Sequence, residues 1–449
     1  MSDCSVSTKN GIDPGLILVG SSQQMSLSKN RRILVFKVKN LKDLVVYKLK
    51  SHLSTGKISL LGLVYRLLIT PQYFKSHVNN FRFRLAYDRK DTINGKSFYN
   101  SLSSDSFVPP VFSVSVNDSC NLRCPNCLYL LEDPEKFFNS RITLTKFRET
   151  LDRFNGSKSA ETLFLSGGEP LMHPEFEELV DIGKEYNFRF IKISTNGVLI
   201  ARNISAIAKL DSINISMDSY DSDTFYKYRK GTQKQFDQII DGLELLNKKD
   251  IKFSLSYVLS KENLHEAPKM IDFSEKMNAE IVHFHNINPH GSDQFSTLMI
   301  QDENTIQFLN NILERTDYPF DITLPVIMDP KSPSFAETHC RQPWEILLYN
   351  SLGNVSYCCH LDHDKEIGNV FEGYDIESPK MKEFRKDLLA GKQVEMSSCR
   401  FCQRRFSGQE FGNFSRSGKR WFVNTNMQFN TNIQPAIAIK NPLVGEGVV

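Results

Sequence analysis

The sequence has no uninterrupted apolar run of the ~18 residues that a membrane-spanning helix requires. Its first ten residues also lack the charged start and the apolar core of a secretory signal. We therefore expect a globular protein of the cytoplasm, a class that fits its 40% hydrophobic and 24% charged residues. At 449 residues the chain is long enough for two or three domains.

Acidic residues are scarce at the N-terminal end, where residues 1–100 contain no glutamate. This stretch holds 17 lysines and arginines against 5 aspartates, which gives a net charge of +12. Because the whole chain carries +3, the remaining 349 residues sum to −9. The N-terminal part is therefore electrostatically distinct from the rest of the chain.

Residues 1–30 are rich in small polar residues and show no period, so we expect a disordered lead-in. The basic region 31–106 follows, with apolar residues at helical spacing between positions 40 and 76, which predicts two amphipathic helices. Docking on the main domain is the favoured role of these helices, and contact with an anionic membrane surface is the main alternative. Nucleic acid is not expected as a partner, because no recognition motif accompanies the charge.

The nine cysteines are odd in number and closely grouped, which argues against a disulfide framework and favours metal ligation in a reducing compartment. Cys120, Cys124 and Cys127 form one CxxxCxxC loop directly after a strand-like run. Three thiolates on one loop can hold three irons of a cubane cluster and leave the fourth iron open. Zinc is the alternative, although structural zinc requires four ligands and this loop supplies three.

Residues 107–300 alternate short apolar runs with segments of helical period. We predict strands at Val111–Asn117, Glu161–Ser166, Arg189–Thr195, Ser212–Met217, Ile251–Val258 and Glu280–Ile287. We predict intervening helices at Thr143–Phe154, Glu175–Tyr186, Lys234–Asn247 and Leu264–Met277. The sequence thus predicts an α/β fold, a partial (β/α)6 TIM-like barrel whose site lies on the loops after the strands.

Three of these strands end in short polar motifs. The second ends in SGGEP at 166–170, where two glycines allow close backbone approach and the glutamate offers an acceptor for an ammonium group. The third ends in ISTNG at 193–197, and the fourth reads NISMDS at 214–219. Hydroxyl, amide and carboxylate groups at successive strand ends suit a ligand that carries a carboxylate and a ribose.

Together, CNLRCPNC, GGEP, STNG and ISMDS resemble the motifs of the radical S-adenosylmethionine (SAM) superfamily over roughly residues 111–300. The resemblance implies that the three cysteines of the first loop bind a [4Fe–4S] cluster whose open iron takes SAM. It also implies a set of cofactor-binding residues, namely Gly167, Gly168 and Glu169 for the amino group, Ser194, Asn196, Ser216 and Asp218 near the carboxylate and ribose, and Arg229. Asn126 departs from the family, which often has an aromatic residue there; Tyr129 or Leu128 can take its place against the adenine.

The late cysteines lie in a region spanning residues 339–405 and read Cys340-x12-Gly353-x4-Cys358, then Cys399-x2-Cys402. This spacing resembles the auxiliary-cluster extension of the same superfamily (SPASM), in its truncated twitch form. The resemblance implies one auxiliary [4Fe–4S] cluster with four cysteine ligands, suited to electron transfer. Cys358 fits the spacing better than Cys359, and a zinc knuckle is the alternative.

Candidate catalytic residues lie on the last two strands. Strand period places His283 and His285 on one face. If that face is the barrel interior, they line a substrate cavity beside Tyr257; otherwise they are structural histidines. Residues 301–338 are expected to form a connecting segment and residues 406–449 a largely disordered tail.

The family chemistry implies that SAM is cleaved reductively to a 5′-deoxyadenosyl radical, with an electron from a flavodoxin- or ferredoxin-type donor. We expect the enzyme to oxidise or rearrange a small polar or sugar-like metabolite. A maturase acting on a peptide, with residues 1–100 binding its leader, is the second hypothesis. A non-catalytic metal-binding or electron-carrying protein is the third, and the GGEP and STNG motifs count against it.

Overall fold

The computed structural model describes much of the chain between residues 109 and 402, chiefly 111–127, 140–155, 162–288, 342–359 and 367–392. The predicted lead-in, the basic helices between 40 and 76 and the tail 406–449 lie outside the described residues, as do Leu128 and Tyr129. None of the described helices is long and apolar enough to cross a membrane.

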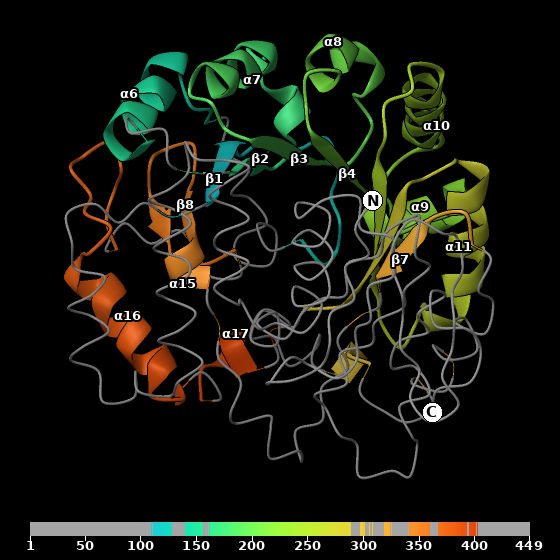
Figure 1. Ribbon diagram of the computed structural model, residues 1–449. Helices are drawn as coiled ribbons and strands as arrows, with labels where there is room; N and C mark the ends of the chain where they lie inside the picture. Colours follow the sequence, from blue (N-terminus) through green and yellow to red (C-terminus); the bar gives the residue numbers. More distant parts are fainter. Residues whose placement is uncertain are drawn as a thin grey trace, which may run out of the picture.

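The centre of the described part is a nine-stranded sheet in the order β7-β6-β5-β4-β3-β2-β1-β8-β9. The strands are β1 Val111–Asn117, β2 Thr162–Gly167, β3 Phe190–Thr195, β4 Ser212–Ser216, β5 Ser254–Leu259, β6 Ile281–Asn286, β7 Asp321–Thr323, β8 Ile346–Tyr349 and β9 Val355–Ser356. Every neighbouring pair is parallel except β8 and β9. The sheet curves, and helices α6, α7, α8, α10 and α11 lie along its outer side (Figure 1). The predicted partial α/β barrel is confirmed.

The four predicted helices are present in the barrel as α6, α7, α10 and α11, and α8 and α9 were not predicted. The barrel helices are α6 Leu144–Asn155, α7 Phe176–Glu185, α8 Ile204–Ile207, α9 Ser222–Arg229, α10 Gln233–Lys248 and α11 Ala267–Lys276, with short 3-10 turns η3 Pro170–Met172, η4 Ala201–Asn203 and η5 Leu264–Glu266. Capping boxes start α9 at Asp221 and α10 at Thr232, where side-chain oxygens accept otherwise unpaired backbone N–H groups. The predicted helix Leu264–Met277 divides into η5 and α11, since Pro268 cannot donate a backbone hydrogen bond and is tolerated only in a first helical turn.

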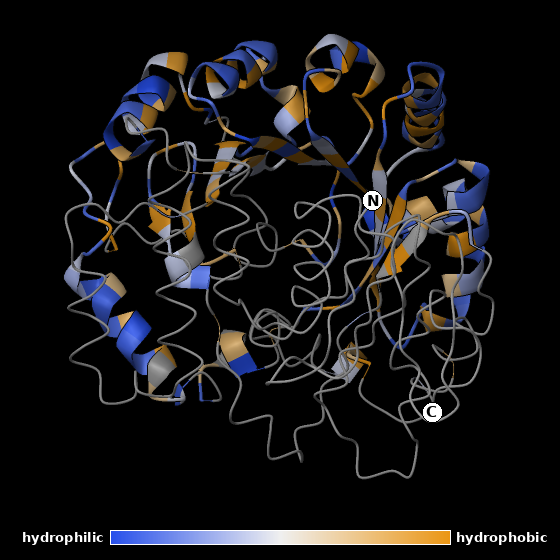
Figure 2. Ribbon diagram, viewed as in Figure 1, coloured by the Kyte–Doolittle hydropathy of each residue, from blue (hydrophilic) through white to orange (hydrophobic). Residues whose placement is uncertain are grey.

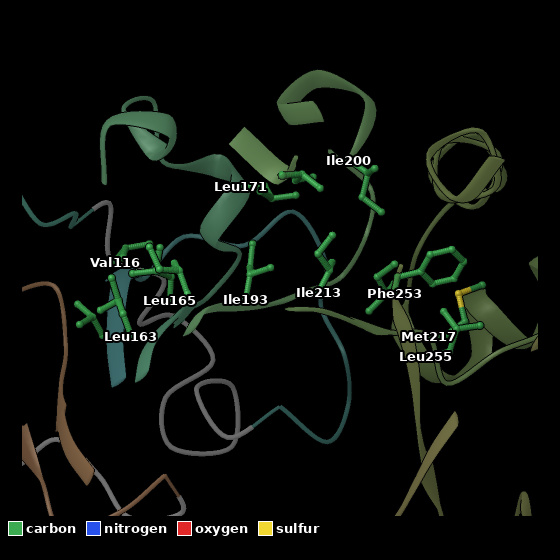
Figure 3. Close-up of a cluster of buried hydrophobic side chains, with 14 of the residues drawn as sticks. Val116, Leu163, Leu165, Leu171, Ile193, Ile200, Ile213, Met217, Phe253 and Leu255 are labelled. Atoms are coloured by element: carbon green, nitrogen blue, oxygen red, sulfur yellow. The ribbon is translucent and has the colours of Figure 1, made fainter. Parts of the chain in front are cut away.

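The two faces of the sheet differ in chemistry. Leu163, Leu165, Ile193 and Ile213 extend toward the outer helices (Figure 3). At Gly183 of α7, an added Cβ would lie 2.7 Å from Leu163, so this helix packs directly on the aliphatic face. The helices carry both hydrophilic and hydrophobic residues, as this packing requires (Figure 2). Because side chains alternate along a strand, the residues between these aliphatic ones lie on the opposite, inner face. Along β3 to β6 they are mainly serine, asparagine and histidine.

The C-terminal region continues the barrel sheet. Strand β8 pairs in parallel with β1, from Val111 opposite Ile346 to Val114 opposite Tyr349. The segment between residues 301 and 338 contributes β7 at the other edge. Helices α15 Gln342–Glu345, α16 Pro379–Leu389 and α17 Ser397–Arg400 complete the C-terminal unit. The sequence predicted six strands. The strands β7, β8 and β9, of two to four residues, were missed because such runs are too short to show a clear alternation.

Candidate functional site

The first cysteine loop follows β1 at the C-terminal edge of the sheet. Cys120, Cys124 and Cys127 are half-buried and form no disulfide. Burial raises the pKa of the Cys120 thiol to about 11 and also raises that of Cys124. Thiols in such an environment are protonated at neutral pH, and iron must displace those protons to be bound.

The GGEP turn after β2 lies directly against this loop. The N–H of Gly168 donates to the carbonyl of Asn117 at 2.9 Å, and the N–H of Glu169 donates to the carbonyl of Ser119 at 2.8 Å. A Cβ on Gly168 would lie 2.6 Å from the carbonyl carbon of Ser119. Gly167 has a φ of +133°, which side chains rarely allow. The two glycines thus permit close approach of the turn to the cysteine loop.

The carboxylate of Glu169 links the GGEP turn to the STNG turn. It is fully buried, and its Oε1 accepts from Leu171 N–H at 3.1 Å and from Thr195 Oγ1 at 2.6 Å. Its Oε2 accepts from the N–H of Asn196 at 2.7 Å. Burial raises the pKa of Glu169, whereas these three donors lower it. Since a carboxylate has about four acceptor positions, one remains on Oε2.

Asn196 reaches the cysteine loop itself. Its Nδ2 donates to Asn121 Oδ1 at 2.6 Å and to Cys120 Sγ at 3.7 Å. Gln235, from the capping box of α10, donates to the carbonyl of Asn121 at 3.0 Å. The sequence predicted Asn196 as a cofactor ligand but missed Asn121 and Gln235. Gln235 is also part of the capping box with Thr232, a local pattern that carries no sign of a site.

Arg229 and Asp218 form a buried ion pair beside the loop. Arg229 Nη1 lies 2.8 Å from Asp218 Oδ2, and the side chains are 12% and 6% exposed. Asp218 Oδ1 accepts from the N–H of Val258 at 2.7 Å. Burial opposes the charge of Arg229, but Cys124 and Asp218 raise its pKa above the usual value. Arg229 Nε is buried and has no hydrogen-bond partner, so the guanidinium retains a donor.

Asp118 connects the cysteine loop to the C-terminal unit. Ser351, in the turn after β8, donates to Asp118 Oδ2 at 2.8 Å, and Ser140 donates to the same oxygen. The two hydroxyl oxygens are 2.8 Å apart. Burial raises the pKa of Asp118, against the effect of both hydroxyl groups. Sequence patterns did not predict this contact, because its partners lie far apart in the chain.

The predicted serines lie on the inner face of the sheet. Asn214 Nδ2 donates to Ser194 Oγ at 3.3 Å, and Ser256 Oγ donates to Asn214 Oδ1 at 2.6 Å. The register places Ser216 opposite Ser256, and Ser256 opposite His283. A polar row therefore runs from β3 to β6 across this face.

The predicted place of Tyr257 beside the histidines is wrong. Tyr257 is opposite Phe284 in the register, on the face that packs against the helices. It is fully buried, and its hydroxyl lies 2.8 Å from Ser274 Oγ of α11. Residues one position apart on a strand face opposite sides, so Tyr257 lies on the other face from His283 and His285.

The two histidines do share the inner face. Their ring centroids are 6.1 Å apart, with the planes nearly parallel. His283 is half-buried and His285 is exposed. Removal from water lowers the pKa of His283 to about 4, so its imidazole is neutral at physiological pH.

This depressed pKa predicts a pH-dependent stability. The unfolded chain binds a proton at His283 near pH 6.5, whereas the folded chain binds it only near pH 4. The free energy of unfolding should therefore be unaffected by His283 above pH 6.5, and it should fall by up to about 3 kcal/mol as the pH decreases to 4. His283→Gln should flatten this slope in urea titrations at pH 7 and pH 5, and His285→Gln should leave it. Equal slopes in all three proteins would contradict the prediction.

The late cysteines also converge. Burial, together with the nearby thiols of Cys402, Cys399 and Cys359, raises the pKa of Cys340. Cys399 and Cys402 are buried, Cys358 is half-buried and Cys359 is exposed. The N–H of Gln342 donates to Cys340 Sγ at 3.4 Å.

Both cysteine groups fit iron–sulfur clusters better than single metal ions. In a cubane cluster each thiolate binds a different iron, whereas a zinc site requires its ligands to converge on one ion. Among the described residues no three His, Cys, Asp or Glu side chains converge on a single-ion position. Three cysteines on the first loop and four late cysteines are the donor sets that fit two [4Fe–4S] clusters.

Comparison with known proteins agrees with this chemistry. Residues 114–274 match the model of the radical SAM superfamily, and residues 340–403 match that of an iron–sulfur cluster-binding domain. The Fe-coproporphyrin III synthase of Methanosarcina barkeri is 30% identical over 213 residues, which cover 46% of this chain and 51% of that protein. The GTP 3′,8-cyclase of Clostridium acetobutylicum is 28% identical over 301 residues, covering 60% and 87%. The chain spans about half the length of the first of these curated relatives.

A solved structure has the same fold. The structure of anSMEcpe with bound AdoMet superposes with a TM-score of 0.52 at 18% sequence identity, covering 68% of this chain and 88% of that one. The two family domains imply [4Fe–4S] clusters and SAM as cofactors. Both domains occur in the order that the cysteine spacing predicted: the chain carries a radical SAM domain at residues 114–274 and, C-terminal to it, an iron–sulfur cluster-binding domain at residues 340–403.

Proposed function

We propose that the protein is an enzyme that cleaves SAM reductively at a cluster held by Cys120, Cys124 and Cys127 and uses the resulting radical to abstract hydrogen from a substrate. The observation that carries this proposal is the convergence of four segments on one cysteine loop. The GGEP turn and Gln235 donate to backbone carbonyls of the loop. Asn196 donates to the sulfur of Cys120, and the backbone carbonyl of Arg229 accepts from the thiol of Cys124.

The protein groups beside the loop suit the two ends of the methionyl moiety. Arg229 is held by Asp218 through Nη1, and its unpartnered Nε would donate to a carboxylate. The remaining acceptor position of Glu169 Oε2 would take an ammonium group. When bound, the cluster and SAM supply one-electron chemistry and a 5′-deoxyadenosyl radical. The protein's task is to orient SAM and keep water from the radical.

The inner face of the sheet supports a small polar or sugar-like substrate. TIM-type barrels usually fill this space with branched aliphatic side chains. Here β3 to β6 present Ser194, Asn214, Ser256 and His283, which bind hydroxyl groups better than hydrocarbon. We propose that the substrate is oxidised or rearranged on this face, with the auxiliary cluster transferring electrons.

The decisive experiment is anaerobic reconstitution followed by dithionite and SAM. We expect about eight irons per chain and formation of 5′-deoxyadenosine. A Cys120→Ser/Cys124→Ser/Cys127→Ser variant should form no 5′-deoxyadenosine, and the matched control Cys4→Ser should behave as the unmodified protein. Two zinc ions per chain, or iron without 5′-deoxyadenosine, would overturn the proposal. Turnover of a peptide and not of a small metabolite would instead favour the maturase hypothesis.

We further propose that Cys358, with Cys340, Cys399 and Cys402, ligates the auxiliary cluster. Its spacing from Gly353 and its lower exposure favour Cys358. The alternative ligand is Cys359, whose thiol contributes to the raised pKa of Cys340. Cys358→Ser should lose about four irons per chain, and Cys359→Ser should retain about eight. The reverse pattern of iron content would assign the fourth ligand to Cys359.

A further inference from the structure

Helix α16 holds a buried arginine that the cysteine motifs do not explain. Arg385 is 2% exposed, and its Nη1 lies 2.7 Å from Glu377 Oε1. Its Nε and Nη2 both donate to the carbonyl of Pro343, at 3.1 and 2.8 Å. Burial of a guanidinium is costly. Because two of its N–H groups donate to the same carbonyl oxygen, we infer that Arg385 holds this carbonyl in place.

That carbonyl belongs to the segment that carries the first late cysteine. Pro343 is three residues after Cys340, and the N–H of the intervening Gln342 donates to Cys340 Sγ at 3.4 Å. Pro343 lies in α15, whose four residues are too few for a self-sufficient helix. The position of the Cys340 thiol therefore depends on contacts from outside its own segment.

The residue next to Arg385 reaches a second cysteine segment. The ring of Phe384 stacks on Tyr357, with centroids 4.2 Å apart and planes inclined by 20°. Tyr357 directly precedes Cys358 and Cys359. Adjacent residues of α16 thus contact two cysteine-bearing segments, and α17, which carries Cys399, follows along the chain (Figure 1).

We propose that α16, which carries no cysteine, is the scaffold of the auxiliary cluster, and that Arg385 is the positioning residue that fixes the Cys340 loop through Pro343. This inference rests on the proposed function, because it assumes that the late cysteines hold a cluster. It differs from the ligand assignment in naming residues that touch no iron. Arg385→Lys retains the charge but loses the fork, so it separates geometry from electrostatics.

The test is the iron and sulfide content of anaerobically reconstituted full-length protein, with electron paramagnetic resonance of the reduced clusters. Arg385→Met and Arg385→Lys should fall from about eight irons to about four and lose the auxiliary signal. The formation of 5′-deoxyadenosine from SAM should stay within about twofold, since the first cysteine loop is untouched. Lys386→Met, an exposed change on the same helix, is the matched control.

A milder variant covers the case in which Arg385→Met fails to fold. Glu377→Gln leaves the arginine in place but removes its counter-charge, and it should raise the alkylation rate of Cys340 in iron-free protein by about tenfold or more, read by mass spectrometry of the peptide. Full iron content in both Arg385 variants, or equal loss of both clusters, would overturn the inference. Failure of the proposed function itself would appear in the unmodified protein, as missing iron or as iron without formation of 5′-deoxyadenosine.

Discussion

Gly168→Ala is expected to abolish assembly of the first cluster and to reduce 5′-deoxyadenosine formation by at least about 100-fold. An added Cβ would lie 2.6 Å from the carbonyl carbon of Ser119 and 2.7 Å from the carbonyl oxygen of Asp118. These are backbone atoms next to Cys120, so they cannot move aside as a flexible side chain does. Relief of the contact must displace either the GGEP turn or the cysteine loop. Iron content and 5′-deoxyadenosine, measured after anaerobic reconstitution, check the prediction.

Gly373→Ala is the matched control for this substitution. Gly373 has a φ of +91°, but an added Cβ there would meet nothing within 4 Å. The control therefore imposes local backbone strain without a contact near the site, and it should keep full iron content. If Gly168→Ala also assembled about eight irons and cleaved SAM normally, the contact between turn and loop would have no functional importance.

Breaking the buried ion pair should produce the second large effect. Arg229→Met leaves the carboxylate of Asp218 buried without its cation, and loss of one partner of a buried pair costs on the order of 3–5 kcal/mol. SAM affinity should fall at least about tenfold, because methionine has no N–H group to donate to the carboxylate of SAM. Asp218→Asn should weaken SAM binding as well, because Arg229 loses its anchor while Val258 keeps an acceptor.

The double variant distinguishes a coupled pair from two independent residues. Arg229→Met with Asp218→Asn should be less destabilised than the sum of the single changes, since no uncompensated charge remains. Urea unfolding and calorimetric titration with SAM give the two quantities. Arg148→Met, which breaks the exposed pair with Glu185, is the control and should change neither. Additive single effects in the cycle would contradict a direct role of Asp218 in holding Arg229.

Strand five shows what periodicity can and cannot decide. The alternation of Ser254, Ser256 and Val258 with Leu255, Tyr257 and Leu259 fixes which residues share a face. The alternation with Leu255 and Leu259 was a signal that Tyr257 faces the helices, whereas we predicted it to lie in the barrel interior beside His283 and His285. The structure satisfies that hydroxyl with Ser274, a partner on a helix that the strand pattern does not describe.

The GGEP, STNG and ISMDS motifs lie at the ends of β2, β3 and β4 as predicted, and their side chains also form hydrogen bonds within the protein. The carboxylate of Glu169 accepts three hydrogen bonds from the protein, and the amide of Asn196 contacts the cysteine loop. Their roles toward SAM stay predictions. A motif fixes residue types at a place in the chain, whereas hydrogen-bond partners depend on which other segments arrive there.

The sequence by itself determined the alternation of strands and helices, the parallel sheet and the two groups of cysteines, because each depends on spacing within a few residues along the chain. The tertiary structure alone decided how the cysteine loop is held. Ser351 reaches Asp118 across 233 residues of sequence, and Arg229 lies at Cys124 across 105. Such contacts arise only when strands β1 and β8 pair and the ends of the strands meet at one edge of the sheet. A pattern within a few residues of sequence does not contain such long-range contacts, so the hydrogen bonds and ion pairs around the cysteine loop could be identified only from the tertiary structure.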